Sequence, residues 1–411
     1  MRYKLSYSPI GERQTITLNG SKSISNRVLI IRALAEQAFD IKNLSNADDT
    51  TKLDNLIRGI TDGAVLDAGA AGTTFRFLTA YLSFRKGTQT LTGSARMKQR
   101  PIKILVDALV SLGARIEYLE NEGYPPLSIL PAEYKGIKKI KLSANVSSQY
   151  ISALMLIAPY LSEGLSIQLS EDIVSLPYLL MTKHIMEQFG AKVDFDGQTF
   201  EVMPGKYQGR DFEIEGDWSA ASYYYTIVGF SKIGYSIKLK GLHKESVQGD
   251  QVISDIGNHF GIETIFEDNE ITLTKVKEGI KDNFNYNFVL CPDLAQSVSV
   301  MMAGLGVEGK LSGLRTLRIK ETDRINALQQ ELSKVGIVIK DQGKEDLMIQ
   351  SGKYIENRKP VFDTYEDHRM AMSLSALGLI SPIEINEPAV VAKSYPLFWD
   401  DLEKLGFKIM P

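Results

Sequence analysis

One pattern recurs five times along this chain of 411 residues and restricts its architecture more than any other feature. Each copy is the end of an amphipathic helix, then a glycine, then a strand of alternating polarity. A glycine that closes a helix explains each copy, because glycine readily takes the left-handed conformation. The near-equal spacing, roughly 70 residues, predicts a repeated unit larger than a solenoid repeat, with a degraded sixth copy around residues 56–63. The five glycines are Gly113, Gly190, Gly261, Gly336 and Gly406.

The repeats and the length together predict an α/β protein of two halves with internal repeats. The strands alternate, as in residues 192–196 (Lys-Val-Asp-Phe-Asp), which is typical of strands with one exposed face. Residues 205–216 are polar and contain glycines, with two clear repeats before them and three after. We therefore expect a domain boundary there.

Composition excludes several classes of function. The net charge of −3 gives no general attraction to nucleic acid or to an acidic membrane, so any anion site must come from local cations. The single Cys291, expected to pack at the end of a buried strand, excludes an internal disulfide framework and fits a reducing cytoplasm. The first residues lack the apolar core of a signal peptide, and the apolar run 151–161 is far shorter than the ~20 residues of a membrane helix. The four histidines are scattered, with no metal-ligand spacing, so we expect no built-in metal. We expect no cofactor.

The segment 19–27, Asn-Gly-Ser-Lys-Ser-Ile-Ser-Asn-Arg, is the most informative one for function. It is a short polar loop that leads into a helix with apolar residues at helical spacing. Free N–H groups at such a helix start, with Lys22 and Arg27 beside them, form an anion site. A capped surface helix with two solvated cations is the alternative. A P-loop is excluded, because Ser21 rather than glycine precedes Lys22.

Three further segments in the first half combine glycine, hydroxyl or cationic groups. Gly72, between small residues, either lets a backbone approach a ligand or makes a tight helix entry. Arg96 either turns inward onto a carboxylate or phosphate, or belongs to a solvated charge run. Ser147 and Ser148 precede an apolar helix over 150–160, where they either cap the helix or bind phosphate with Gln149.

Three segments in the second half carry carboxylates among cations. Asp293 is either an N-cap or a base for a substrate hydroxyl. In residues 318–324 (Arg-Ile-Lys-Glu-Thr-Asp-Arg), ion pairs between residues three or four positions apart on a helix could account for every charge. Asp367 is expected to cap a helix that contains His368 and Arg369, whose Met and Leu residues belong to the core.

Together, seven segments resemble the EPSP synthase family of enolpyruvyl transferases, in the family's order along essentially the whole chain. Residues 20–27 match its N-terminal signature, and residues 96–101 (Arg-Met-Lys-Gln-Arg-Pro) closely match its Arg-Met-Lys-Glu-Arg-Pro segment. Residues 367–372, Asp-His-Arg-Met-Ala-Met, match a further segment of the family. Residues 320–324, Lys-Glu-Thr-Asp-Arg, are identical to one of its hallmarks, and residues 393–396, Lys-Ser-Tyr-Pro, resemble its Lys-Thr-Phe-Pro. Ala70 and Phe77 depart from the family's usual residues and leave sensitivity to the herbicide glyphosate open. Thr316 stands where the family often has Asn, which weakens one expected substrate contact.

The resemblance implies the substrates shikimate 3-phosphate and phosphoenolpyruvate, with Lys22, Asp293 and Glu321 as candidate proton carriers and His368 in support. The residues implied for shikimate 3-phosphate are Lys22, Ser23, Arg27, Ser147, Ser148, Gln149, Ser175, Tyr178, Asp293 and Lys320. Those implied for phosphoenolpyruvate are Lys22, Gly72, Arg96, Gln149, Arg324, Arg369 and Lys393. Two doubly acidic substrates independently call for cations from distant segments to converge.

The resemblance also implies two domains of three repeated units, each with helices inside and sheets outside. Residues 1–19 and 217–411 would form one domain and residues 20–216 the other, with the active site in a cleft that closes on binding. We expect a cytoplasmic monomer that acts on small molecules. Two alternatives stay open: the sister enzyme that uses UDP-N-acetylglucosamine, which typically has Lys-Asn in the first segment and a Cys on a mobile loop, and a non-catalytic anion-binding module.

Overall fold

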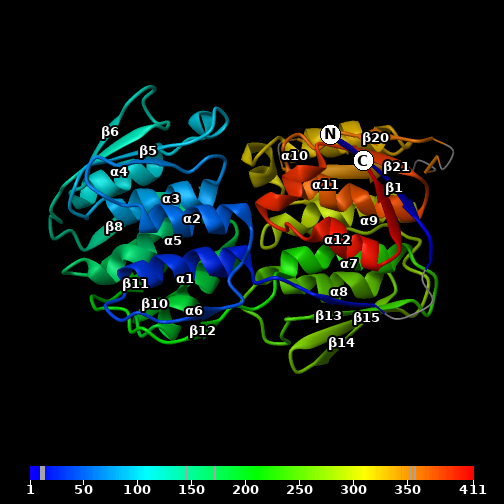
Figure 1. Ribbon diagram of the computed structural model, residues 1–411, viewed down its shortest axis with the longest axis horizontal. Coiled ribbons are helices and arrows are strands. Elements are labelled where there is room, and N and C mark those ends of the chain that lie inside the picture. Colours follow the sequence, from blue (N-terminus) through cyan, green and yellow to red (C-terminus); the bar gives the residue numbers. More distant parts are fainter. Residues whose placement is uncertain (10–13, 144–146, 171–172, 344, 351–353, 356–357) are drawn as a thin grey trace. The chain divides into compact units, whose positions relative to one another are not determined.

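The computed structural model describes residues 1–9, 14–143, 147–170, 173–343, 345–350, 354–355 and 358–411 (Figure 1). The chain divides into two compact units, which are described separately. Unit 1 consists of Met1–Gly20 and Glu215–Pro411, and unit 2 of Ser21–Ile214. The chain thus begins in unit 1, builds unit 2 and returns. Gly20 and Gly216 form an isolated antiparallel bridge within unit 1, at the two points where the chain leaves and re-enters it.

In its described residues, unit 2 contains two four-stranded sheets of the same topology and one parallel pair of strands. In each larger sheet the first two strands are parallel and the remaining neighbours are antiparallel. In sheet order, the first comprises β4 (Val65–Asp67), β5 (Gln89–Thr92), β7 (Leu127–Leu130) and β6 (Arg115–Tyr118). The second comprises β8 (Lys139–Ser143), β9 (Leu165–Ser170), β11 (Thr199–Val202) and β10 (Val193–Phe195), and the pair is β3 (Ile41–Lys42) with β12 (Phe212–Glu213).

The described part of unit 1 repeats that topology in three four-stranded sheets. The first comprises β2 (Gln14–Thr17), β13 (Ser236–Lys240), β15 (Glu270–Lys275) and β14 (Ile262–Glu267). The second comprises β16 (Tyr286–Asn287), β17 (Gly309–Ser312), β19 (Leu347–Gln350) and β18 (Val338–Asp341). The third comprises β20 (Val361–Phe362), β21 (Ile383–Asn386), β1 (Arg2–Tyr7) and β22 (Phe407–Met410), so both chain ends share one sheet (Figure 1).

The five repeat glycines have the conformation that the sequence predicts. All have positive φ, from 75° at Gly261 to 118° at Gly113. Gly113 is the C-cap of α4 (Lys103–Leu112), and a Cβ added there would lie 2.4 Å from the Glu133 carbonyl oxygen. The other four follow shortly after the helices α6 (Leu176–Gln188), α8 (Ile253–His259), α10 (Arg324–Ser333) and α12 (Phe398–Lys404). The prediction of helix-closing glycines is confirmed.

Helices supply most of the core of each unit, while the strands alternate between buried and half-exposed residues. The apolar run 151–161 forms α5 (Ser148–Ile157) and the 3-10 helix η2 (Ala158–Tyr160) inside unit 2. The other helices of unit 2 are α1 (Lys22–Leu34), α2 (Asp48–Arg58), α3 (Gly72–Leu82) and the 3-10 helix η1 (Met97–Gln99).

In unit 1, the buried helices α7 (Trp218–Phe230) and α9 (Ala295–Leu305) pack against each other. The others are α11 (His368–Ser375) and the 3-10 helices η3 (Gly249–Val252), η4 (Pro292–Leu294), η5 (Arg315–Ile319), η6 (Ala376–Leu379) and η7 (Pro388–Lys393). Cys291 is buried, but the expectation that it ends a strand is wrong, because β16 stops at Asn287. Among the described helices, none combines the length and apolarity needed to cross a membrane.

Candidate active site

The first segment of unit 2 places a cation beside a carboxylate. Ser21 is the N-cap of α1 by its backbone, and Lys22 is the first helical residue. The Lys22 ammonium lies 3.3 Å from Asp49 Oδ2, in the first turn of α2. Only 17% of the Lys22 side chain is exposed, so the alternative of a fully solvated cation is wrong for this residue. The sequence reading missed Asp49, because nothing in its own segment marks it as a partner for Lys22.

Arg27 is buried inside unit 2, so the alternative of a solvated surface cation is wrong here also. Its Nε donates to Thr182 Oγ1 at 2.7 Å, its Nη1 to the Ser23 carbonyl oxygen at 2.8 Å and its Nη2 to the Tyr178 carbonyl oxygen at 3.1 Å. These partners are neutral oxygens, and burial lowers the pKa of Arg27 to about 10. A guanidinium held in this way keeps its positive charge available to an anion.

Gln149 links two segments of unit 2. Its backbone N–H donates to the Oγ of Ser147, the N-cap of α5, as the capping alternative predicts. Its side-chain Oε1 accepts from Arg76 Nη1 at 2.9 Å, while Nε2 donates to Thr73 Oγ1 at 2.8 Å. The amide orientation is therefore fixed from both ends. Sequence reasoning assigned no role to Arg76 or Thr73, although both lie in the segment that contains Gly72.

Gly72 begins α3 next to two guanidinium groups. A Cβ at this position would lie 2.5 Å from Arg76 Nη1 and 2.6 Å from Arg100 Nη1. A side chain at this position would force the two guanidinium groups to move, so glycine allows them to lie against the start of α3. Sequence reasoning assigned no role to Arg100 either, although it ends the charge run that begins at Arg96.

The remaining unit 2 candidates lie at the starts of helical turns. Arg96 precedes η1, and its Nη1 donates to Gln99 Oε1 at 3.4 Å. Lys98, in the same charge run, pairs with Glu120 at 2.5 Å on the surface, as the solvated alternative predicts for this residue. Ser148 is the first residue of α5, and Ser175 is the left-handed N-cap of α6 (φ 60°), close to Tyr178.

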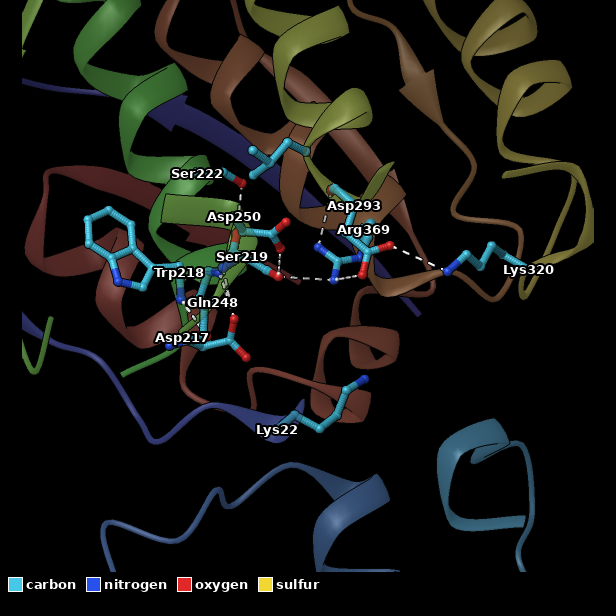
Figure 2. A network of polar contacts seen from close by, with 12 residues as sticks. Lys22, Asp217, Trp218, Ser219, Ser222, Gln248, Asp250, Asp293, Lys320 and Arg369 are labelled. Atoms are coloured by element: carbon cyan, nitrogen blue, oxygen red, sulfur yellow. Dashed lines mark hydrogen bonds and ion pairs between the residues drawn. The ribbon is translucent and has the colours of Figure 1, made fainter. Parts of the chain in front are cut away.

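In unit 1, Asp293 lies at the centre of a group of cations (Figure 2). Its carboxylate accepts from Arg369 Nη2 at 2.9 Å and from Arg324 Nη1 at 3.2 Å, and Lys320 Nζ lies at 3.7 Å. Burial alone would raise the pKa of Asp293, but these three cations hold it well below its ordinary value. The N-cap alternative is wrong, because Asp293 lies within η4 and α9 begins after Leu294.

Arg324 connects three carboxylates and is 2% exposed. Its Nε donates to Asp367 Oδ2 at 2.7 Å, and its Nη2 donates to Glu321 Oε2 at 2.9 Å. Glu321 precedes α10, which begins at Arg324 itself, and Asp293 and Asp367 come from other segments. Pairing confined to a helix therefore does not account for these charges. Asp367 caps α11 through the Arg369 N–H at 2.8 Å, which confirms the predicted cap.

Arg369 has further partners on α7. Its Nη2 donates to Ser219 Oγ at 3.3 Å and its Nη1 to the Tyr223 hydroxyl at 3.4 Å. His368, beside it, is buried. Lys393, at the end of η7, donates to the Glu366 carbonyl oxygen at 2.7 Å.

Asp250 is a titratable neighbour of this group that sequence reasoning missed, since residues 248–251 (Gln-Gly-Asp-Gln) match no motif in the sequence analysis. It accepts from Ser219 Oγ at 2.5 Å. Burial, with Asp293 nearby, raises the pKa of Asp250 to about 7. Burial also shifts the pKa of Lys320, but downward, because it disfavours the charged ammonium.

Each unit thus carries buried or half-buried cations beside hydroxyl, amide or carboxylate groups. The family model for EPSP synthase (3-phosphoshikimate 1-carboxyvinyltransferase) matches residues 12–62 and 56–402. The chain belongs to the EPSP synthase family. It is 46% identical to a 3-phosphoshikimate 1-carboxyvinyltransferase of Bacteroides fragilis, over 100% of this chain and 99% of that one. A Sulfurovum relative of the same name is 36% identical over 95% of this chain and 96% of that one.

Solved structures of the EPSP synthase family and its neighbours have the same α/β fold. The Acinetobacter baumannii EPSP synthase aligns with a TM-score of 0.79 at 22% identity, over 100% of both chains. The enolpyruvyl transferase NikO from Streptomyces tendae aligns with a TM-score of 0.72 at 15% identity, over 100% of this chain and 98% of that one. At these identities the likeness concerns the fold. In the described parts of the chain, no cluster of three or more His, Cys, Asp or Glu residues could hold a metal ion.

Proposed function

We propose that this EPSP synthase family member transfers the enolpyruvyl group of phosphoenolpyruvate to the 5-hydroxyl of shikimate 3-phosphate. The products are 5-enolpyruvylshikimate 3-phosphate and phosphate, in the route to chorismate and the aromatic amino acids. Full-length identity to enzymes named for this reaction supports the proposal. The observation that carries it is an ionised carboxylate, Asp293, held among Lys320, Arg324 and Arg369.

The two substrates each carry a phosphate and a carboxylate, which cations and hydroxyls bind. For shikimate 3-phosphate we assign Lys22, Ser23, Arg27, Ser147, Ser148, Gln149, Ser175, Tyr178, Asp293 and Lys320. For phosphoenolpyruvate we assign Lys22, Gly72, Arg96, Gln149, Arg324, Arg369 and Lys393, with His368 in support. Arg76 and Thr73 would orient the Gln149 amide, since they bond its two ends.

The environment of Asp293 suits a base that becomes stronger when substrates bind. Its pKa is low because three cations surround it. When the substrates' anionic groups engage Lys320, Arg324 and Arg369, they offset part of that positive field, and the pKa of Asp293 rises toward a useful value. Proton transfer would thus depend on both substrates being present.

The reaction that we propose has two steps. In the addition, the 5-oxygen attacks C2 of phosphoenolpyruvate, Asp293 takes the hydroxyl proton, and an acid protonates C3. In the elimination, the tetrahedral intermediate loses phosphate from C2 and a proton from C3, leaving the enolpyruvyl ether. Glu321 and Lys22 are the remaining candidate proton carriers, and the cations stabilise the developing phosphate charge.

We further propose that each unit builds three copies of one repeat with helices inside and sheets outside. The domain limits expected from the sequence, 1–19 with 217–411 and 20–216, differ by one or two residues from the limits of the two units. Within the residues that the structure describes, five four-stranded sheets share one topology and β3 pairs with β12 in a sixth, two-stranded sheet, which supports the repeat. We propose a cytoplasmic monomer whose partners are the two small substrates rather than nucleic acid or membrane. Sedimentation at several protein concentrations tests the monomer.

The sister reaction with UDP-N-acetylglucosamine is less well supported. Ser23 follows Lys22 where that enzyme typically has Asn, and the single Cys291 is buried. Burial, with Asp250 nearby, raises the pKa of the Cys291 thiol to about 12, so it is a poor nucleophile. A non-catalytic module would not require the ionised Asp293.

Phosphate release from phosphoenolpyruvate tests the proposal. We expect release with shikimate 3-phosphate, formation of the enolpyruvyl ether by mass spectrometry, and no release with UDP-N-acetylglucosamine. Asp293→Asn should bind both substrates and release phosphate at least ~10²-fold more slowly. Absence of turnover with shikimate 3-phosphate would refute the assignment, and release with the nucleotide sugar alone would favour the sister enzyme.

A further inference from the structure

Asp250 lies within the described site of unit 1 but has no place in the reaction above. It belongs to η3, is 4% exposed, and accepts one hydrogen bond on Oδ2 from Ser219 Oγ at 2.5 Å (Figure 2). Among the residues that the structure describes, its Oδ1 has no hydrogen-bond partner. A buried carboxylate with an unbonded oxygen is costly to stability, so its position calls for an explanation.

Ser219 connects this carboxylate to Arg369. Arg369 Nη2 donates both to Ser219 Oγ, at 3.3 Å, and to Asp293 Oδ2, at 2.9 Å. A guanidinium can only donate, so Ser219 Oγ must accept from it. The hydroxyl hydrogen of Ser219 is then directed to Asp250 Oδ2. The three residues form a chain with one direction, from Arg369 through Ser219 to Asp250.

We propose that Asp250 is a positioning residue for Arg369, whose guanidinium it holds through Ser219 in the orientation that binds phosphoenolpyruvate. The inference rests on the proposed function and on the role assigned there to Arg369. Asp250 itself touches no substrate in this proposal. Its effect is specific, because Arg324 is held by Asp367 and Glu321 and not through Ser219.

The hydrogen bonds from Arg369 through Ser219 to Asp250 are strongest when Asp250 is ionised, because a carboxylate oxygen accepts a stronger hydrogen bond than a neutral carboxyl does. The charged or titratable groups near Asp250 or in contact with Arg369 include Asp293, Asp217, Cys291 and Tyr223, besides Arg369 itself. Burial first, then Asp293, raises the pKa of Asp250 to about 7, against the opposing effect of Arg369. Below this pH the chain weakens, so the affinity for phosphoenolpyruvate should fall as the pH drops through 7.

Steady-state kinetics of the full chain with both substrates, from about pH 6 to about pH 9, test the inference. The variants are Asp250→Asn, Ser219→Ala and their combination. Asp255→Asn, which alters an exposed carboxylate on the adjoining α8, is the matched control. We expect Asp250→Asn to raise the KM for phosphoenolpyruvate roughly tenfold, with the KM for shikimate 3-phosphate within about twofold of wild type. The KM of the double variant for phosphoenolpyruvate should be no higher than that of the more affected single variant, because both substitutions break the same series of hydrogen bonds.

The pH profile separates positioning from a merely structural role. Relative to wild type and Asp255→Asn, the Asp250→Asn enzyme should lose the rise in KM for phosphoenolpyruvate below pH 7. Equal KM increases for both substrates, or an unchanged pH profile in Asp250→Asn, would overturn the inference while leaving the proposed function intact. If Arg369→Lys raised only the KM for shikimate 3-phosphate, the role of Arg369 would be wrong and the inference would fall with it. An inactive wild type would instead refute the proposed function itself.

Discussion

Substitution of Glu321 should lower turnover strongly while changing the stability of the protein little. Its carboxylate is 21% exposed and accepts from Arg324 Nη2 at 2.9 Å, while Arg324 keeps Asp293 and Asp367 as further partners. Removing Glu321 therefore leaves no buried charge without a counter-ion. We expect Glu321→Ala to lower the free energy of unfolding by only about 1–2 kcal/mol.

The effect of Glu321→Ala on turnover should be much larger. Loss of an acid–base group costs roughly 10²–10⁴ in rate, which corresponds to about 3–5 kcal/mol of barrier. Phosphate release at saturating substrates measures it, and urea unfolding measures stability on the same samples. Glu321→Gln distinguishes the two possible roles, because its amide oxygen still accepts from Arg324 but cannot exchange a proton at neutral pH. Both variants should lose turnover.

Asp323 is the matched control for Glu321. It caps α10 through the Asn326 N–H at 3.1 Å and pairs with Arg318 on the surface. Asp323→Ala should lose about 1 kcal/mol of stability with turnover close to wild type. Turnover unchanged in Glu321→Ala, or restored in Glu321→Gln, would refute the assignment of Glu321 as a proton carrier.

Three further predictions concern stability, each checked by urea unfolding. Arg324→Met removes the buried partner of Asp293 and Asp367 and should cost about 3–5 kcal/mol, and a loss below about 1 kcal/mol would contradict the described network. Gly113→Ala forces a Cβ onto a carbonyl oxygen at positive φ and should cost about 1–3 kcal/mol, whereas Gly136→Ala, with open space at positive φ, should cost less. The raised pKa of Asp250 means that the folded state binds its proton more tightly than the unfolded state does. The stabilising contribution of the bound proton is therefore present below about pH 4 and is lost as the pH rises through 7. Across that window the free energy of unfolding of Asp250→Asn should increase relative to that of wild type, by on the order of a few kcal/mol. A constant difference across these pH values would show that Asp250 does not titrate in this way.

The sequence predicted the helix-closing glycines correctly because their signal is local. A helix that ends in a left-handed residue needs glycine wherever a Cβ would meet backbone, as at Gly113, whatever the rest of the chain does. The cap at Asp367 is equally local, since its carboxylate bonds an N–H two residues later. Strand limits were less certain, because two-residue strands such as β16 depend on a partner far away in sequence.

By itself the sequence determined the α/β class, the helix-closing glycines, the family and the segments that carry the cations, because each of these depends on short, contiguous patterns. Only the tertiary structure decided which charges meet. Asp293 is bonded by Arg324 and Arg369 from separate helices, and Asp250 reaches Arg369 only through Ser219. Such contacts join residues dozens of positions apart, and their energetics depend on burial. Neither the distant contact nor the burial of a residue can be read from its neighbours in sequence, which is why Asp250 matched no motif.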